Sequence, residues 1–237
     1  MSGPRSFLAI VACALLCACA SPPEKVDLSP RAAAALRTVA VVLPPEPRVY
    51  SVLNMGNPAL AFALVGGIFV AADQDEKEAK LYKAMTIQNF SLARLLGARL
   101  VQKLAEDGYR TRLARDAWEE RNGRPVLRPE RAAQGADALL VVVPITTGFV
   151  ARGPTADYVP TVTVLARLLS PDGRTELYRA YHASGWQPRA DHWRFTPASG
   201  GFSDFDALMA HPAASAAALA RGTEAVAASI ARDLRRP

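Results

Sequence analysis

The stretch of sequence that decides the fold is TVAVVL, at residues 38–43, and Pro44 and Pro45 follow it directly. An apolar, β-branched run without polar alternation is typical of a β-strand buried on both faces, as in a parallel sheet covered by helices. Proline ends such a strand because it has no N–H to donate to the sheet. The run ALLVVV at residues 138–143 repeats the pattern, so the sequence predicts two central strands.

Leucine spacing between these two runs predicts a long helix over residues 76–106. Apolar residues recur there at intervals of four or seven, at Leu81, Met85, Leu92, Leu96, Leu100 and Leu104. Those intervals place the side chains on one face of a helix, and Gly108 suits its end. A short strand over residues 109–113 and a second helix over residues 129–134 complete the connection to the second buried strand.

The carboxyl-terminal half predicts a β-hairpin followed by a helix. Residues 159–169 and 176–186 have the composition of strands, and Ser-Pro-Asp-Gly between them suits a tight turn. Residues 187–210 are expected to form a loop, and residues 208–234 an alanine-rich closing helix. The resulting order, β-α-β-α-β-β-β-α, predicts an α/β fold: a single mixed sheet with helices packed on it, whose first three strands are parallel.

The amino terminus predicts a lipoprotein signal peptide over residues 1–18. One basic residue, Arg5, precedes an apolar run that is too short to span a bilayer. The run ends in LCAC at residues 16–19, which resembles the lipobox of bacterial lipoproteins. In those proteins the cysteine receives a diacylglycerol and becomes residue one of the mature chain, so the resemblance implies that Cys19 is lipidated. The alternative is a plain secretory signal, cleaved after residue 18 or residue 20.

The cysteines agree with export through the envelope. All three lie within residues 13–19, so the mature chain holds one, acylated, which suits an oxidising compartment. Two or three acyl chains such as palmitate anchor a protein stably where one does not. Ala20 after the cysteine resembles outer-membrane sorting, which implies an anchor at the periplasmic face of the outer membrane. Residues 19–37 are expected to be a tether, and residues 38–237 a single domain.

Composition excludes several classes of protein. Half of the 237 residues are hydrophobic and 21% are charged, which is ordinary for a globular domain and unlike collagen or a disordered chain. The net charge of +6 comes without any dense run of lysine or arginine, so we expect no nucleic-acid partner.

The element order and the lipobox together resemble two known groups over about residues 38–186. These are the small amino-terminal α/β domain of TolB and the core of curli-secretion lipoproteins such as CsgG. The resemblance implies the same type of sheet and, in the curli case, a homo-oligomer. In that group the region corresponding to residues 59–72 forms membrane hairpins when copies assemble, although the two arms here are shorter.

Residues 59–72, ALAFALVGGIFVAA, form the most apolar segment of the mature chain. As a helix they would reach about 21 Å, short of a hydrocarbon core of about 30 Å, so they do not predict a membrane span. One interpretation is a buried helix or loop packed on the sheet. The other is an exposed patch that docks on a membrane or a partner, with Leu64 and Phe69 as the largest contacts and Gly66 and Gly67 permitting close approach or a hairpin bend.

A second candidate contact surface lies in residues 185–195, which are dense in aromatic residues and include Trp186 and Trp193. Tryptophan is a frequent anchor of binding surfaces. These rings are expected to cover one end of the sheet, to form a contact surface for a protein or glycan, or to lie at a membrane interface.

Catalytic motifs are lacking in the sequence. We find no nucleophile elbow, phosphate-binding loop or metal-binding helix motif, and the three histidines are scattered. We therefore expect no catalytic residue, cofactor or metal, and predict a non-enzymatic envelope lipoprotein: a lipid-anchored periplasmic adaptor in an outer-membrane assembly or transport complex with an envelope protein partner. The alternatives are an oligomeric secretion-channel component of the curli type and a periplasmic enzyme acting on envelope polymers.

Overall fold

The computed structural model describes residues 24–46, 49–55, 63–186 and 193–236, with the backbone alone at residues 63–73 and 193. The expected signal peptide over residues 1–18 and the expected lipidation site, Cys19, lie outside these residues.

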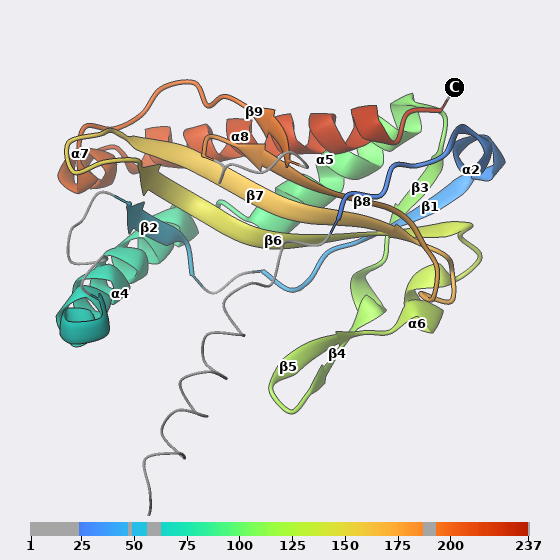
Figure 1. The fold of residues 1–237 in the computed structure, drawn as a ribbon, viewed down its shortest axis with the longest axis horizontal. Helices are drawn as coiled ribbons and strands as arrows, with labels where there is room; N and C mark the ends of the chain where they lie inside the picture. The colour runs from blue at the N-terminus through green and yellow to red at the C-terminus, as the bar shows by residue number, and fades with distance from the viewer. Residues whose placement is uncertain (1–23, 47–48, 56–62, 187–192, 237) are drawn as a thin grey trace, which may run out of the picture.

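One sheet of seven strands forms the centre of the fold (Figure 1). Six strands follow the order β3–β1–β6–β7–β8–β9, and β2 pairs with β6 beyond the end of β1. β1 is parallel to β3 and β6, β7 is antiparallel to β6 and β8, and β9 is parallel to β8. The predicted mixed sheet and its parallel first part are therefore confirmed. The strands are β1 (Thr38–Val42), β2 (Ser51–Asn54), β3 (Arg110–Leu113), β6 (Ala138–Ala151), β7 (Tyr158–Leu169), β8 (Glu176–Ser184) and β9 (Trp193–Thr196).

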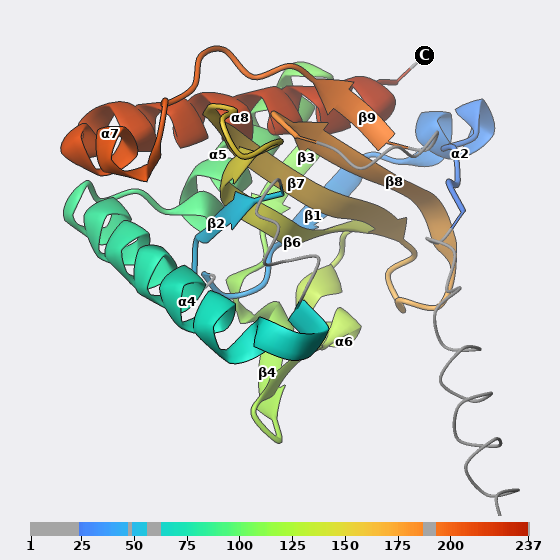
Figure 2. The ribbon, with the colours of Figure 1, turned by 60° about the vertical axis from the view of Figure 1, so that its left-hand side comes forward.

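Two helices, α5 (Leu92–Glu106) and α8 (Pro212–Asp233), lie side by side on one face of the sheet (Figures 1 and 2). Their apolar faces form the main core with the strands beneath them. Val41 and Val142 of the strands and Leu100 and Leu219 of the helices are all fully buried. Burying a side chain of this size stabilises a fold by about 1.5–3 kcal/mol, so this layer holds the domain together.

The other face of β1 and of the start of β6 carries a smaller core. Ala40, Val42 and Leu139 pack there against α6 (Pro129–Ala133) and the 3₁₀ helix η2 (Arg115–Ala117). Between η2 and α6 a two-stranded hairpin, β4 (Trp118–Arg121) and β5 (Arg124–Leu127), projects from the body of the domain (Figure 1).

The single helix predicted over residues 76–106 is two helices, α4 (Ala63–Ile87) and α5. Asn89 adopts a left-handed conformation, with φ of 54°, and Ser91 begins the second helix as its N-cap. Asparagine tolerates positive φ and serine is a preferred N-cap, so both residues favour the break. The leucine pattern does not reveal this break, because the interval of seven from Met85 to Leu92 is also the interval that one continuous helix would show.

Several strand predictions need correction. β6 continues to Ala151, eight residues beyond the predicted end, because a register shift between Pro144 and Thr146 lets the strand pass a proline. β8 ends at Ser184, before Gly185, and residues 193–196 of the expected loop form β9. The prediction also lacks β2 and the β4–β5 hairpin. Within the same expected loop, residues 205–210 form a short helix, α7 (Phe205–Ala210).

The interval expected to be a tether contains ordered structure from Glu24 onward. Val26 forms an antiparallel bridge with Arg179 of β8, and helix α2 (Pro30–Ala35) follows. Ala33 and Leu36 are buried against the domain. The packed part of the chain therefore begins well before Thr38.

Candidate functional site: a groove beside α5

A groove of about 750 Å³ lies where β1 and β3 end. Because the two strands are parallel, their carboxyl ends meet at one edge of the sheet, which is where α/β folds usually place a binding site. The segments that follow the strands form one wall, and α5 forms the other. The lining includes Leu43, Val101 and Leu113, so the walls are largely aliphatic.

Gly97 lets α5 approach the strand ends closely. A Cβ atom at this position would lie 2.9 Å from Leu43 Cδ1 and 3.1 Å from Leu113 Cδ1. Both contacts are shorter than normal packing allows, so any larger residue would push the two leucines into the groove. The absence of a side chain at Gly97 therefore helps to shape it.

A carboxylate in the lining of the groove caps α5. Glu46 Oε1 accepts a hydrogen bond from the backbone N–H of Leu92 (2.8 Å), and Oε2 accepts one from Ala93 N–H (2.9 Å) and one from Ser91 Oγ (2.7 Å). The Tyr50 hydroxyl donates to Oε1 at 2.8 Å. Burial first, and then the hydrogen bond to Glu46, raise the pKa of Tyr50, so its hydroxyl stays a neutral donor. With both oxygens committed, Glu46 is a structural group rather than a free acid or base.

The rim of the groove carries positive charge. Arg94 and Arg115 both line it and both are exposed. Arg94 donates to the backbone and side-chain oxygens of Asn89, which are neutral, so its charge is not compensated there. Arg94 and Ala98 also line a second hollow of about 360 Å³ between α5 and α8. The exposed face of α5 is thus a low ridge between two hollows, and we call this surface the α5 ridge.

The sequence-predicted contact residues belong to other segments of the chain than those that line this groove. Leu64, Gly66, Gly67 and Phe69 lie in the first two turns of α4, and only their backbone is described. The helix is continuous through the two glycines, so a hairpin bend there is wrong. Within the described residues, no helix combines the length and the hydropathy needed to cross a membrane.

The two predicted tryptophans lie at the two ends of the connection between β8 and β9. Trp186 is half-buried just after β8, and the backbone of Trp193 begins β9. The groove itself was not predicted from the sequence. The one sequence feature that points to it is the double proline after a buried strand, because it marks the carboxyl end of that strand.

A second polar cluster is buried between β8 and α8. His182, fully buried, lies 2.8 Å from Ser229 Oγ through Nδ1 and 2.7 Å from the Tyr178 hydroxyl through Nε2. Tyr178 donates its one proton to Asp233, at 3.0 Å, and Arg194 Nε donates to the same Asp233 oxygen at 2.8 Å. His182 must therefore donate from Nε2 and accept from Ser229 at Nδ1, so the chain of bonds is fully satisfied.

The contact between Ser229 and His182 resembles the nucleophile–base pair of a hydrolase, but its surroundings do not suit catalysis. Burial lowers the pKa of His182 to about 4, so it is a weak proton acceptor at neutral pH. Ser229 is 6% exposed, and it lines neither the groove nor the hollow between α5 and α8. The cluster joins a strand to a helix.

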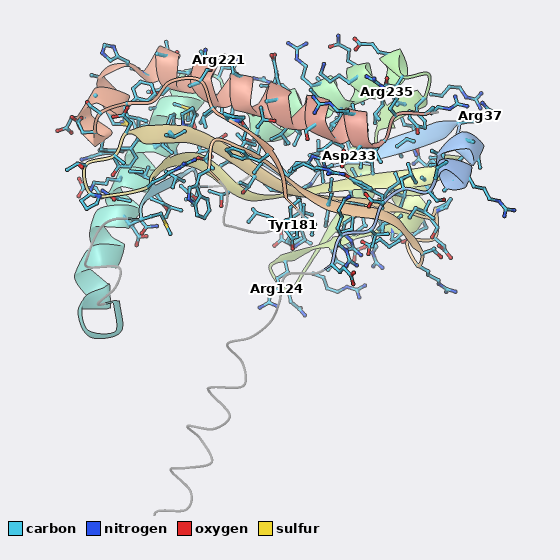
Figure 3. All side chains as sticks on the ribbon, turned by 45° about the horizontal axis from the view of Figure 1, so that its top comes forward. Arg37, Arg124, Tyr181, Arg221, Asp233 and Arg235 are labelled. Carbon is cyan, nitrogen blue, oxygen red and sulfur yellow. The ribbon has the colours of Figure 1, made fainter. Side chains whose placement is uncertain are left out.

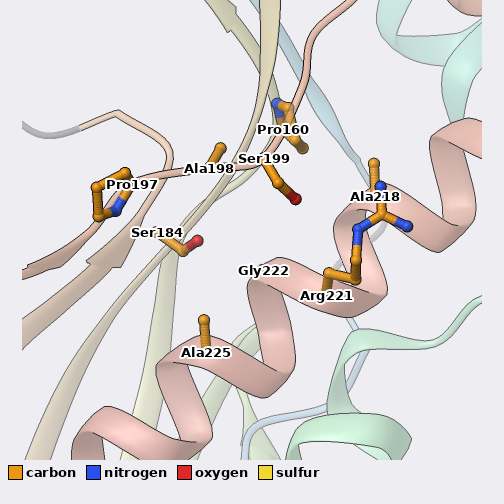
Figure 4. Close-up of a pocket in the computed structure, with 9 residues that line it drawn as sticks. All are labelled: Pro160, Ser184, Pro197, Ala198, Ser199, Ala218, Arg221, Gly222 and Ala225. Carbon is orange, nitrogen blue, oxygen red and sulfur yellow. The ribbon is translucent and has the colours of Figure 1, made fainter.

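Neighbouring residues enclose a small cavity of about 110 Å³ between α8 and residues 197–199 (Figure 4). Ser184 and Gly222 lie in its wall and Arg221 at its side (Figure 4). Its volume suits a few water molecules and not a metabolite. Across the described residues, no group of three or more histidine, cysteine or acidic side chains is arranged to hold a metal ion.

Comparison with known proteins adds little. No family model and no curated protein matches this chain. Among solved structures, the chain is similar to the lipoprotein GNA1162 from Neisseria meningitidis, with 20% identity, a TM-score of 0.28, and coverage of 62% of this chain and 81% of that one. It is also similar to a dodecamer of a PelC variant from Paraburkholderia phytofirmans, with 14% identity, a TM-score of 0.30, and coverage of 86% and 95%. TM-scores this low support no functional conclusion.

We expect Glu46→Ala to lower the free energy of unfolding by about 2–4 kcal/mol, because it leaves two helix N–H groups and two hydroxyls without their acceptor. Urea unfolding followed by circular dichroism measures the loss. Glu46→Gln, which keeps one acceptor oxygen, should cost less. Glu76→Ala on the exposed side of α4 is the control, and an equal effect at residues 46 and 76 would contradict the capping role.

We expect His182 to make the protein sensitive to acid. Burial holds its folded pKa near 4, while the nearby Asp233 acts in the opposite direction and Arg194 and Arg232 act with burial. A histidine with a depressed folded pKa contributes stability in full above its unfolded pKa of 6.5, and this contribution falls by about 3 kcal/mol as the pH approaches 4. His182→Gln should flatten the pH dependence of unfolding over this window, whereas His211→Gln, at an exposed site, should leave it unchanged.

Proposed function

We propose that this protein is a non-enzymatic envelope lipoprotein: an adaptor anchored by acyl chains on Cys19 to the periplasmic face of the outer membrane, which binds an envelope protein partner through the α5 ridge and its groove. The observation that carries the proposal is the groove. Its aliphatic walls, its volume of about 750 Å³ and its committed carboxylate suit binding rather than chemistry.

The chemistry of the surface favours one kind of partner. An apolar groove and a ridge on an exposed helix fit an amphipathic segment that lays its apolar side chains into the hollows. Arg94 and Arg115 at the rim favour acidic residues beside those apolar ones. The expected partner segment is therefore apolar in the middle and acidic at its flanks.

The alternatives have less support. Curli-type membrane hairpins need two extended arms joined at a bend, and residues 63–87 form one helix instead. An enzyme needs an accessible reactive group, and the Ser229–His182 pair is enclosed between a strand and a helix. A homo-oligomer remains compatible with an adaptor, and light scattering of the detergent-solubilised protein measures it.

Cys19→Ser should leave the precursor unprocessed and abolish partitioning into the detergent phase, because the thiol that receives the lipid is gone. Cys17→Ser is the matched control: its serine suits the position two before the lipidated cysteine, and processing should continue. Incorporation of labelled palmitate into the Cys19→Ser protein would contradict the anchor.

A photocrosslinking residue placed at Ala98 should capture one envelope protein in intact cells, because Ala98 is exposed on the ridge between the two hollows. The same residue at Ala105, exposed on the last turn of α5, is the control. Arg94→Glu with Arg115→Glu should reduce the adduct at least tenfold, equivalent to a loss of about 1.4 kcal/mol. Equal adducts at positions 98 and 105 would contradict a partner site on the ridge.

A further inference from the structure

The small cavity between α8 and residues 197–199 has polar side chains on several of its sides. Its volume is about 110 Å³, and Ser184 at the end of β8, Ser199 and Arg221 of α8 all line it. In Figure 4 the hydroxyl of Ser184 lies on the cavity side of β8, and the hydroxyl of Ser199 points toward α8. A strand, a connecting segment and a helix therefore each contribute one polar side chain to the same small space.

Gly222 leaves room for this arrangement. A Cβ atom at residue 222 would lie 3.6 Å from Ser184 Oγ and 3.3 Å from Val162 Cγ2. The first distance is an ordinary van der Waals contact and the second is tighter than usual packing, so a larger side chain there would cover the hydroxyl. With glycine at this position, α8 passes close to the sheet and the Ser184 hydroxyl stays open to the cavity.

The Ser184 hydroxyl has no partner in the described part of the chain. The residue is 2% exposed, and no hydrogen bond joins its side chain to any other described group. The hydroxyl of Ser199 is likewise without a hydrogen bond among the described residues. Because a buried polar group without a partner costs free energy, such groups normally bind something. Both hydroxyls are therefore free to donate to a molecule in the cavity.

Arg221 makes the cavity electropositive. It is exposed on α8, and the described lining contains no acidic residue to oppose its charge. The two acidic residues of α8 have other partners. Glu224 pairs with Arg99 of α5 at 2.8 Å. Asp233 lies about three turns along the helix from Arg221 (Figure 3), and it pairs with Arg194. The guanidinium of Arg221, which has no ion pair among the described residues, is therefore available to an anion.

Three donor side chains without an acidic one favour a single class of ligand. A guanidinium accompanied by hydroxyl donors is a usual environment for a carboxylate or a phosphate. Water can satisfy the two hydroxyls, but it cannot compensate the charge of Arg221. A metal ion would need acidic, histidine or cysteine ligands, which the described lining lacks. The small volume excludes a ligand as large as a nucleotide.

We infer that this cavity binds a small oxyanion, a carboxylate or inorganic phosphate, with Arg221 supplying the charge and Ser184 and Ser199 supplying hydroxyl donors. The bound oxyanion joins residues 197–199 to α8 and to the end of β8. The cavity shares no lining residue with the groove or with the hollow between α5 and α8. This site is therefore independent of the lipid anchor and of the partner surface on the α5 ridge.

Thermal unfolding of the full-length protein in detergent tests the site. Sodium phosphate and sodium acetate are each titrated at constant ionic strength, with sodium chloride as the reference salt. A ligand that binds only the folded state raises the unfolding midpoint. We expect phosphate or acetate to raise it by at least about 2 °C relative to chloride, and the more effective anion distinguishes a phosphate site from a carboxylate site. A rise with neither anion would overturn the site and leave a cavity filled by water.

Arg221→Gln should weaken the apparent affinity for the anion at least about fivefold, because it removes the charge and keeps a polar side chain. Arg232→Gln is the matched control, since Arg232 is exposed on the same helix and does not line this cavity. Its response to the anion should equal that of the wild-type protein. An equal response in Arg221→Gln would place the anion elsewhere on the protein and overturn the site.

Ser184→Ala separates anion binding from a structural role of the hydroxyl. Because the hydroxyl has no partner among the described residues, its loss should not lower the unfolding midpoint in sodium chloride. The same variant should weaken the apparent affinity for the anion at least about threefold. A lowered midpoint in chloride together with an undiminished response to the anion would show that the hydroxyl serves the fold, and would overturn its assignment to the site.

Discussion

The contact between Glu46 and the first turn of α5 is the interaction on which the rest of the arrangement depends. The chain leaves β1 at two prolines and returns to the sheet as β2, and the described residues between the two strands, 43–46 and 49–50, belong to no strand. Glu46 fixes this connection to the amino end of α5 with three hydrogen bonds, and Tyr50 completes the set. A carboxylate at a helix amino terminus also opposes the helix dipole, which adds to the hydrogen bonds. The same contact sets the position of α5, and hence both the core beneath it and the groove beside it.

The elements whose signal is local can be predicted from the sequence. The runs at residues 38–43 and 138–143 are buried strands because they carry no polar alternation, and their parallel pairing agrees with the helical connections from β1 to β3 and from β3 to β6. Elements that depend on a partner distant in the sequence cannot be predicted in this way. β2 is four residues long and exists because β6 continues past Pro144 to pair with it. Gly148 permits that pairing, since a Cβ there would lie 1.9 Å from the carbonyl oxygen of Ser51.

The candidate site shows the same division. The double proline marks one wall of the groove, but the helix cap joins residues 46 positions apart in sequence, Glu46 and Leu92, and no local pattern predicts it.

The β4–β5 hairpin could have been predicted from the sequence, because Asn122-Gly123 is the strongest short signal for a tight hairpin turn. Both residues have positive φ. His182 also carried a signal. It is spaced by two residues from Ala180 and by four from Tyr178, so the three side chains share one face of the strand. That face is buried, which places His182 in the core rather than in a metal site.

The two polar clusters differ in what they leave available to a ligand. In the His182 cluster, both ring nitrogens of His182 and the hydroxyls of Tyr178 and Ser229 have partners within the protein, so these hydrogen bonds serve to join β8 to α8. Around the groove, the polar atoms of Glu46 are satisfied, and the aliphatic walls and two arginines remain exposed. Apolar surface left accessible beside uncompensated charge is what a binding site requires and what a core avoids. This contrast is why the binding interpretation follows from the groove.

The ordered structure of residues 24–37 costs conformational entropy that a flexible tether would keep. Fixing a residue loses roughly 1–2 kcal/mol of conformational entropy, and the bridge at Val26 together with the buried Ala33 and Leu36 offsets that loss over this stretch. A flexible linker would spare the cost and let the domain tumble freely at the membrane. The contacts instead leave four residues between Cys19 and Glu24. If Cys19 carries the proposed acyl anchor, these contacts shorten the tether, and the place where the chain leaves the sheet limits how the domain can turn relative to the lipid.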